Sequence, residues 1–147
     1  MTNSYENQLY NWFFCGKIGK GDRMNGEYTL EEMSYVIKKS WCRESCYPKY
    51  QDVWRKENPS YGQDVVTSLL LYDYFKGNIK KCYVGETPHY FNIINKEIID
   101  LTKEQFLGRE IPYEKAVYKK RSDLLKNKNV YSRYILLRER VEGCLEQ

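Results

Sequence analysis

The run DVVTSLLLYDYF, residues 64–75, constrains the fold of this chain more than any other segment. Its aliphatic residues fall on every side of a helical projection, so a helix formed here has no broad polar face and is largely buried. Gly77 and Asn78 follow after Lys76 and are a typical helix stop. A buried helix needs a covering layer on its hydrophobic surface, and the segments that follow it have the pattern of a sheet.

Three short strand-like segments come next in the chain: IKKCYV (79–84), HYFNII (89–94) and EIIDL (97–101). The last two are separated only by Asn95 and Lys96, a spacing typical of a tight hairpin. TKEQF (102–106) predicts one helical turn, and residues 113–127 and 131–147 read as two closing helices. The pattern predicts an α+β fold in which a central helix packs on a small antiparallel sheet with flanking helices.

The N-terminal part of the chain contains the one candidate domain boundary. Residues 1–27 read as a short helical appendage followed by a Gly-rich linker, and residues 28–147 as a single α+β domain. Thr29 and Glu32 have the spacing of a capping box at the start of a helix over 29–41. The segment 42–62 contains two prolines and a glycine without a sustained period, and predicts a long ordered loop.

Composition places the chain among globular proteins and limits the classes of partner that it is expected to bind. The 147 residues carry a net charge of +4, which is too small to indicate nucleic-acid binding by itself. Basic residues do concentrate between Lys115 and Arg140, which leaves an interaction module on the closing helices as one hypothesis. No apolar run reaches the length of a membrane span, and the N-terminus lacks the pattern of a signal peptide. With five cysteines and no dense framework, reduced thiols and a cytoplasmic location are expected.

A candidate site emerges from one histidine and two aspartates. His89, the only histidine, begins one predicted strand, and Asp100 ends the next. A hairpin turning at residues 95–96 brings the two close together, so the carboxylate can orient the imidazole. Asp64 begins the central helix, where backbone N–H groups stabilise an anion, and Gln63 can offer an amide donor. The order of helix start, His and Asp is that of papain-like enzymes, although Asp100 could instead cap the turn after it, and Asp64 could be an ordinary N-cap.

The motifs SWCRESCYP, ENPSYGQD and HYFNIINKEIIDLTKEQF, over roughly residues 35–106, resemble the YunG-like family of small, largely uncharacterised bacterial proteins. The resemblance implies a papain-like core and a thiol site with a Cys-His-Asp arrangement. The family pattern has Cys after Gly-Gln, where this chain has Asp64. Three interpretations follow: a natural pseudoenzyme that binds through the retained pocket, an enzyme inactivated by an introduced substitution, or an Asp64 nucleophile that forms an ester intermediate.

The remaining site predictions concern the cleft around these residues. Catalytic-type residues are Asp64, His89, Asp100 and Gln63, and binding residues are Cys46, Trp54, Asn58, Tyr90 and Asn92. Cys46 is also an alternative nucleophile, which would make the chain an amide or ester hydrolase or an acyl transferase with His89. The expected ligand is a small molecule or peptide, with no cofactor. A zinc site from Cys42, Cys46 and Cys82 is disfavoured because the spacing lacks a second pair of ligands.

Overall fold

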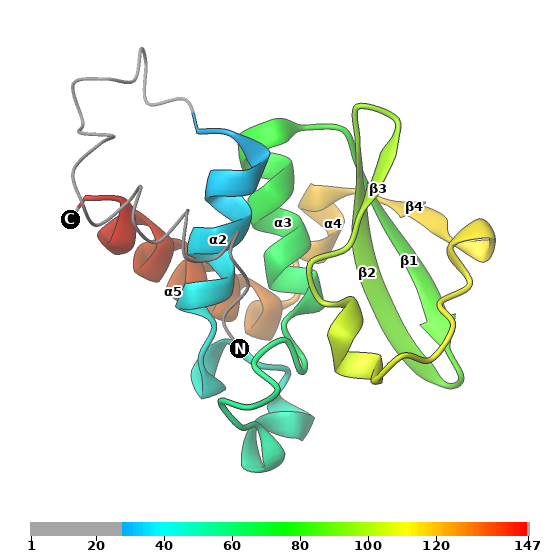
Figure 1. The fold of residues 1–147 in the computed structure, drawn as a ribbon, viewed down its shortest axis with the longest axis horizontal. Coiled ribbons are helices and arrows are strands. Elements are labelled where there is room, and N and C mark those ends of the chain that lie inside the picture. Colours follow the sequence, from blue (N-terminus) through cyan, green and yellow to red (C-terminus); the bar gives the residue numbers. More distant parts are fainter. Residues whose placement is uncertain (1–27, 147) are drawn as a thin grey trace.

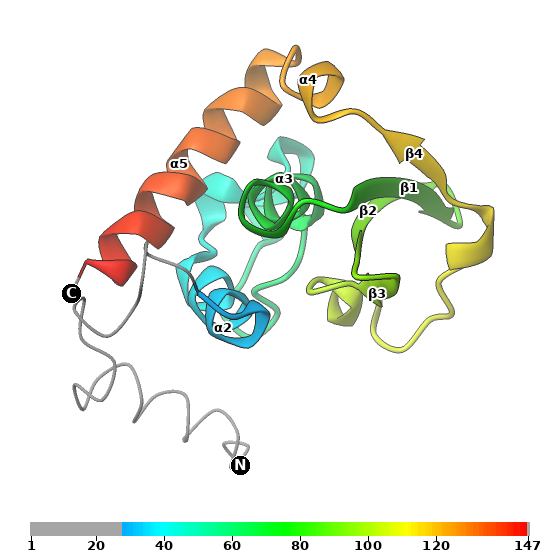
Figure 2. The same ribbon diagram turned by 90° about the horizontal axis from the view of Figure 1, so that it is seen from above.

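The computed structural model describes residues 28–146, so the predicted appendage over residues 1–27 lies outside the described part of the chain. Figure 1 shows helices gathered on one side of the molecule and strands on the other. The central helix α3 (Asp64–Phe75) lies between them, with α2 (Leu30–Ser40) and α5 (Lys128–Leu145) against its outer side (Figure 2). The α+β class and the central position of this helix are confirmed.

Helix α3 is buried because its aliphatic residues face both layers. Val66, Leu69, Leu70 and Leu71 are all at most 1% exposed, and they join the core formed with α2 and α5. The helix ends at Phe75, and Gly77 in the turn after it has a φ of 75° and a backbone contact with Ile93 that leave no room for a side chain. The turn therefore delivers the chain directly into the first strand.

The sheet has the order β3-β2-β1-β4 and is antiparallel throughout. Its first three strands are β1 (Asn78–Val84), β2 (Thr87–Ile94) and β3 (Glu97–Ile99). Asn92 pairs with Ile99 across the turn at residues 95–96, which is the predicted hairpin register. The β2 strand packs on α3, so the register also fixes which β2 residues face that helix.

The first predicted closing helix is wrong. Residues 113–127 contain a short 3₁₀ turn η6 (Tyr113–Lys115), strand β4 (Val117–Lys119) and one helical turn α4 (Arg121–Leu124). Strand β4 pairs with the edge of β1 that would otherwise be open, and the Lys80 ammonium lies 4.6 Å from the centre of the Tyr118 ring. Tertiary pairing thus overrides a weak helical pattern. The second closing helix exists as α5, with Asn127 as its N-cap.

The segment between α2 and α3 is ordered by short helical turns and by a distant arginine. It contains η3 (Arg43–Ser45) and η4 (Pro48–Val53), and the predicted capping box at Thr29 and Glu32 is present before α2. Arg133 of α5 is buried and donates to the Ser45 carbonyl at 3.1 Å, which ties this segment to the helical layer. After β3, the predicted turn is η5 (Lys103–Phe106). Within residues 28–146, no helix is both long and apolar enough to cross a membrane.

Candidate functional site

The backbone turn at Gly62 sets the start of α3 and hence the position of the site. Gly62 has a φ of 72°, and a Cβ atom there would lie 2.6 Å from the Cys46 sulfur. Its carbonyl accepts from the Tyr47 N–H at 2.8 Å, and its own N–H donates to Gln105 Oε1 at 3.2 Å. The segments around Tyr47 and Gln105 therefore hold the Gly62 turn in place, and the turn directs Asp64 toward β2.

Asp64 is the first residue of α3, and its side chain bridges to the sheet instead of capping its own helix. Asp64 Oδ2 accepts from the Tyr90 backbone N–H at 2.9 Å, and no side-chain cap bond is present at the helix start. The alternative that Asp64 is an ordinary N-cap is therefore wrong. An acidic group at this position still lies in the positive field of the helix N-terminus.

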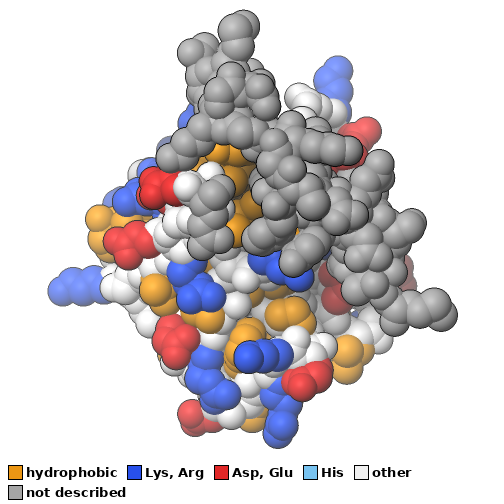
Figure 3. All heavy atoms as spheres, turned by 60° about the vertical axis from the view of Figure 1, so that its left-hand side comes forward, with side chains coloured by type: hydrophobic (Ala, Val, Ile, Leu, Met, Phe, Trp, Pro, Cys, Tyr) orange, Lys and Arg blue, Asp and Glu red, His pale blue; other side chains and the backbone are white. Residues whose placement is uncertain are grey.

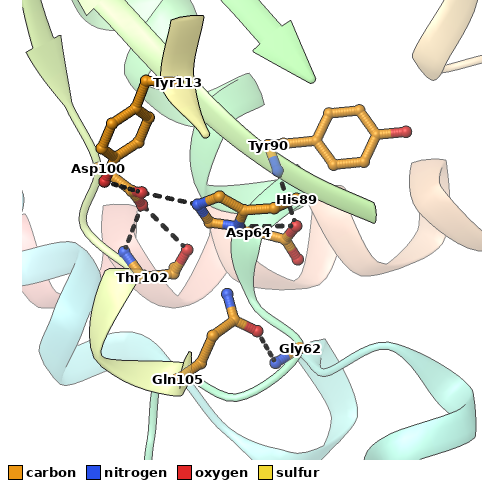
Figure 4. Close-up of polar contacts among 8 residues, drawn as sticks. All are labelled: Gly62, Asp64, His89, Tyr90, Asp100, Thr102, Gln105 and Tyr113. Atoms are coloured by element: carbon orange, nitrogen blue, oxygen red, sulfur yellow. Dashed lines mark hydrogen bonds and ion pairs between the residues drawn. The ribbon is translucent and has the colours of Figure 1, made fainter. Parts of the chain in front are cut away.

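His89 lies between two carboxylates (Figure 4). Its Nε2 is 2.7 Å from Asp100 Oδ2, and its Nδ1 is 3.6 Å from Asp64 Oδ2. The His89 ring is fully buried. It packs in a T-shaped arrangement with the ring of Phe106, and the two ring centroids are 4.8 Å apart. The hairpin register and the start of α3 thus bring the three predicted residues together.

Asp100 is held by three groups and orients the imidazole. Oδ2 accepts from the Tyr113 hydroxyl at 2.8 Å in addition to contacting His89, and Oδ1 accepts from the Thr102 N–H at 3.2 Å. The carboxylate therefore performs both roles considered from the sequence, since it organises the turn after β3 and fixes the ring of His89. Its side chain is only 3% exposed, which strengthens both interactions.

The electrostatics of this cluster favour an imidazolium. Burial by itself lowers the pKa of His89, but the hydrogen bond to Asp100 and the negative charges of Asp100 and Asp64 outweigh it and raise the pKa from 6.5 to about 9. At neutral pH the ring is therefore a cation between two anions. A cation of this kind is a poor general base, because it has no free lone pair to accept a proton.

The single histidine makes this charge state directly measurable. In a tag-free protein, we expect the two imidazole nitrogens to report a protonated ring up to about pH 8, with a midpoint near 9. Replacing Asp64 by Asn should lower the midpoint, because one of the two anions that favour the charged ring is lost. The measurement is a ¹⁵N-detected NMR titration from pH 5 to 10. A midpoint near the ordinary value of 6.5 in the wild-type protein would contradict the ion cluster.

Gln63 is buried, and its amide bonds to the segment between α2 and α3. Its Nε2 donates to the Cys42 carbonyl at 2.8 Å, and its Oε1 accepts from the Ser45 hydroxyl at 2.7 Å. These contacts give Gln63 a structural role in joining η3 to the start of α3. They do not favour the prediction that it offers an amide donor to a ligand.

A pocket of about 560 Å³ opens in front of Asp64. Its walls come from the loop after α2, the start of α3, the β1–β2 turn, η5 and the first turns of α5. Its lining includes Tyr47, Lys49, Gly62, Asp64, Tyr90, Gln105 and Arg133. A volume of this size is in the range of sites for small ligands. Asp64 reaches the pocket, whereas His89 and Asp100 lie behind it.

The predicted binding residues divide between pocket and scaffold. Tyr90 lines the pocket, but Trp54, Asn58 and Asn92 do not. The Trp54 indole donates to the Pro59 carbonyl at 3.1 Å, and Asn92 donates to the Ser68 carbonyl at 3.0 Å, joining β2 to α3. Asn58 accepts from the Ser60 hydroxyl. These three residues hold the loop and the contact between β2 and α3. The prediction that they contact a ligand is therefore replaced by a structural role.

Cys46 is not placed to act as a nucleophile. Its sulfur packs under Gly62 and is 0% exposed, and burial raises the pKa of its thiol to about 11. A protonated and inaccessible thiol reacts slowly. All four described cysteines are free, and no group of metal-ligating side chains in residues 28–146 is arranged to hold a metal ion.

Three residues of the site were not singled out from the sequence. Tyr113 and Arg133 both fall in segments that the sequence predicts as closing helices, and nothing in their local pattern indicates a position beside the site. Gln105 had a signal, since it belongs to the DLTKEQF motif that carries the family resemblance. Its neighbour Phe106 contacts His89, so this motif positions both groups.

Comparison with known proteins decides the family. The model of the family described as YunG protein matches residues 29–146, which is nearly all of the described chain. The chain belongs to the YunG family. A relative from Bacillus subtilis (strain 168), named Uncharacterized protein YunG, is 42% identical over 77 residues, which is 52% of this chain and 63% of that relative. The match thus spans less than two thirds of the relative's length. No solved structure matches the chain.

For this YunG-family domain, the match encloses the whole candidate site, from the Gly62 turn to Arg133. The family assignment supplies no activity. The ion cluster and the pocket in front of it are the features of the site that bear on its function.

Proposed function

We propose that this domain is a binding protein built on a papain-like thiol-hydrolase site that lacks its nucleophilic cysteine. Asp64 stands where the resemblance implies a thiol, and the His89–Asp100 pair behind it is retained. The observation that carries the proposal is the carboxylate of Asp64, which faces a protonated His89 and forms the anionic member of the ion pair. The site keeps the charges of a thiolate–imidazolium pair without a thiol.

The pocket chemistry favours a small polar ligand. Basic and acidic side chains are nearly balanced in its lining, with Lys49 and Arg133 opposed by Asp64, Glu86 and Asp123. Tyr47, Tyr50 and Tyr90 add aromatic surface. This mixture suits a neutral peptide or an acyl-amide compound, which uses both hydrogen bonds and apolar contact.

An active enzyme with an Asp64 nucleophile is the second candidate. Such an enzyme needs a base to activate water against the ester intermediate, and His89 is protonated at neutral pH. Its activity would therefore rise with pH through about 9. This pH dependence separates it from the binding protein.

The interaction module on the basic C-terminal segment receives little support. Several of those basic residues are used internally: Arg121 pairs with Asp73, Lys126 with Asp123, and Arg133 and Arg140 donate to backbone carbonyls. Figure 3 shows the helical side of the molecule, where blue and red side chains are interspersed. On the part of that face that is not covered by grey atoms, the basic side chains do not form a continuous surface for an acidic partner.

A panel of N-acetyl amino acid amides tests the proposal. We expect some of them to bind saturably at pH 7 and to shift the backbone N–H signal of Tyr90, because that group bonds to Asp64. The amides should be recovered intact, as shown by mass spectrometry, from pH 6 to 10. Hydrolysis that increases through pH 9 and disappears in both Asp64→Asn and His89→Gln would establish the enzyme instead.

A further inference from the structure

Gln105 has a buried amide whose nitrogen has no partner. Gln105 is only 8% exposed, and its Nε2 is buried without a hydrogen-bond partner. Its Oε1 accepts from the Gly62 N–H at 3.2 Å, and this bond fixes which end of the amide is which. A buried donor left unpaired costs stability unless something else satisfies it.

The unpaired nitrogen is directed into the candidate site. Figure 4 shows the amide nitrogen of Gln105 on the side of His89 and Asp64, with its oxygen toward Gly62. Gln105 and Asp64 both line the pocket. Because the Gly62 turn is itself held by the Tyr47 N–H, the donor is anchored to a rigid part of the backbone.

We propose that Gln105 Nε2 is the donor that recognises a neutral acyl oxygen of the ligand, at a position next to residue 64. The proposal rests on the function proposed above and names a substrate-recognition contact for it. The adjacent carboxylate of Asp64 repels a ligand carboxylate, so an amide or ester carbonyl is the oxygen that fits. The amide of Gln63, which sequence order suggested for this role, is bonded to Cys42 and Ser45 instead.

A thiol at position 64 turns this contact into a measurable rate. In an Asp64→Cys background, iodoacetamide offers an amide carbonyl next to the reacting carbon, whereas methyl iodide has the same leaving group and no oxygen. Alkylation of residue 64 is followed by peptide mass spectrometry, so the native cysteines do not interfere. The ratio of the two rates cancels any change in thiol pKa, which affects both reagents alike.

We expect Gln105→Met in that background to lower the iodoacetamide-to-methyl-iodide ratio about threefold to tenfold, the range of one neutral hydrogen bond. Gln51→Met is the matched control, because the Gln51 amide donates to the Cys46 carbonyl and does not line the pocket. That variant should leave the ratio unchanged. A circular dichroism melt of each variant checks that the fold is intact.

Two failures can be told apart. A reactive, His89-dependent thiol whose rate ratio is indifferent to Gln105 overturns this inference and leaves the proposed function standing. If the reactivity of the thiol at residue 64 does not depend on His89, the proposed function loses its support. If the iodoacetamide-to-methyl-iodide ratio still falls in Gln105→Met, the acyl-oxygen contact is nevertheless upheld. Gln105→Leu serves as a second variant if the Met variant does not fold, and the same ratio is read from it.

Discussion

The Asp64→Cys variant should carry a thiol of unusually high reactivity. The start of α3, the Tyr90 N–H that now bonds to Asp64 and the imidazolium of His89 all stabilise a thiolate at this position. Its pKa should fall well below the ordinary value of about 8.5, so at pH 7 alkylation should be roughly tenfold faster than for a free thiol. The native thiols of Cys46 and Cys82 differ sharply, because burial raises the pKa of each to about 11.

The measurement is the iodoacetamide rate at residue 64 between pH 5 and 9, with mass spectrometric assignment of the site. His89→Gln in the same background should remove most of the gain, because the imidazolium is lost while the helix start remains. Asp64→Ser provides the matched control for the loss of the carboxylate, and its native cysteines should react as in the wild-type protein. An ordinary pH profile that is independent of His89 would show that the site never suited a thiolate.

The free energy of unfolding should fall steeply as the pH rises toward 10. His89 has a pKa near 9 in the folded protein and an ordinary value of 6.5, so the folded state holds its proton more tightly. The stabilisation is fully present below pH 6.5 and is lost as the pH rises through about 9. The shift corresponds to about 3 kcal/mol for this buried group.

Urea denaturation at pH 6, 7.5, 9 and 10 measures this loss, and the His89→Gln variant serves as the reference at each pH. The difference between the two proteins isolates the histidine, because the other titrating groups are common to both. The Asp100→Asn variant should lose a large part of the stabilisation at pH 6, since it leaves a buried cation with one weaker partner. A difference that is constant from pH 6 to 10 would contradict a raised pKa in the folded state.

Local sequence pattern was sufficient for the elements with a strong period or a defined turn. The buried run predicts a helix from Gln63 or Asp64 to about Phe75, and α3 spans Asp64–Phe75; the Asn95–Lys96 spacing predicts the register of β2 and β3. The register then accounts for the approach of His89 to Asp100. These contacts are close in sequence, so local pattern carries the information.

The parts that were missed depend on contacts between distant segments. Strand β4 forms because β1 has an open edge, a fact that the residues of 113–127 do not record. Tyr113 reaches Asp100 only because that strand pairs where it does, and Arg133 is buried only because α5 lies over η3. The side-chain direction of Gln63 was missed for the same reason, since its partners Cys42 and Ser45 precede it by a whole loop.

Positions 62 and 64, on either side of Gln63, differ in their tolerance to substitution because of the hydrogen-bonded turn at Gly62. Position 62 is closed to other residues, because a side chain there would run into the Cys46 sulfur and the backbone of Tyr47. Position 64 is more tolerant, because the Gly62 turn and the His89–Asp100 pair are held by bonds that do not involve it, and its own bond to the Tyr90 N–H needs only a small side chain that can accept a hydrogen bond. Exchange of one residue can therefore change the chemistry of the pocket while its shape is inherited, so members of the family can diverge in activity without diverging in fold.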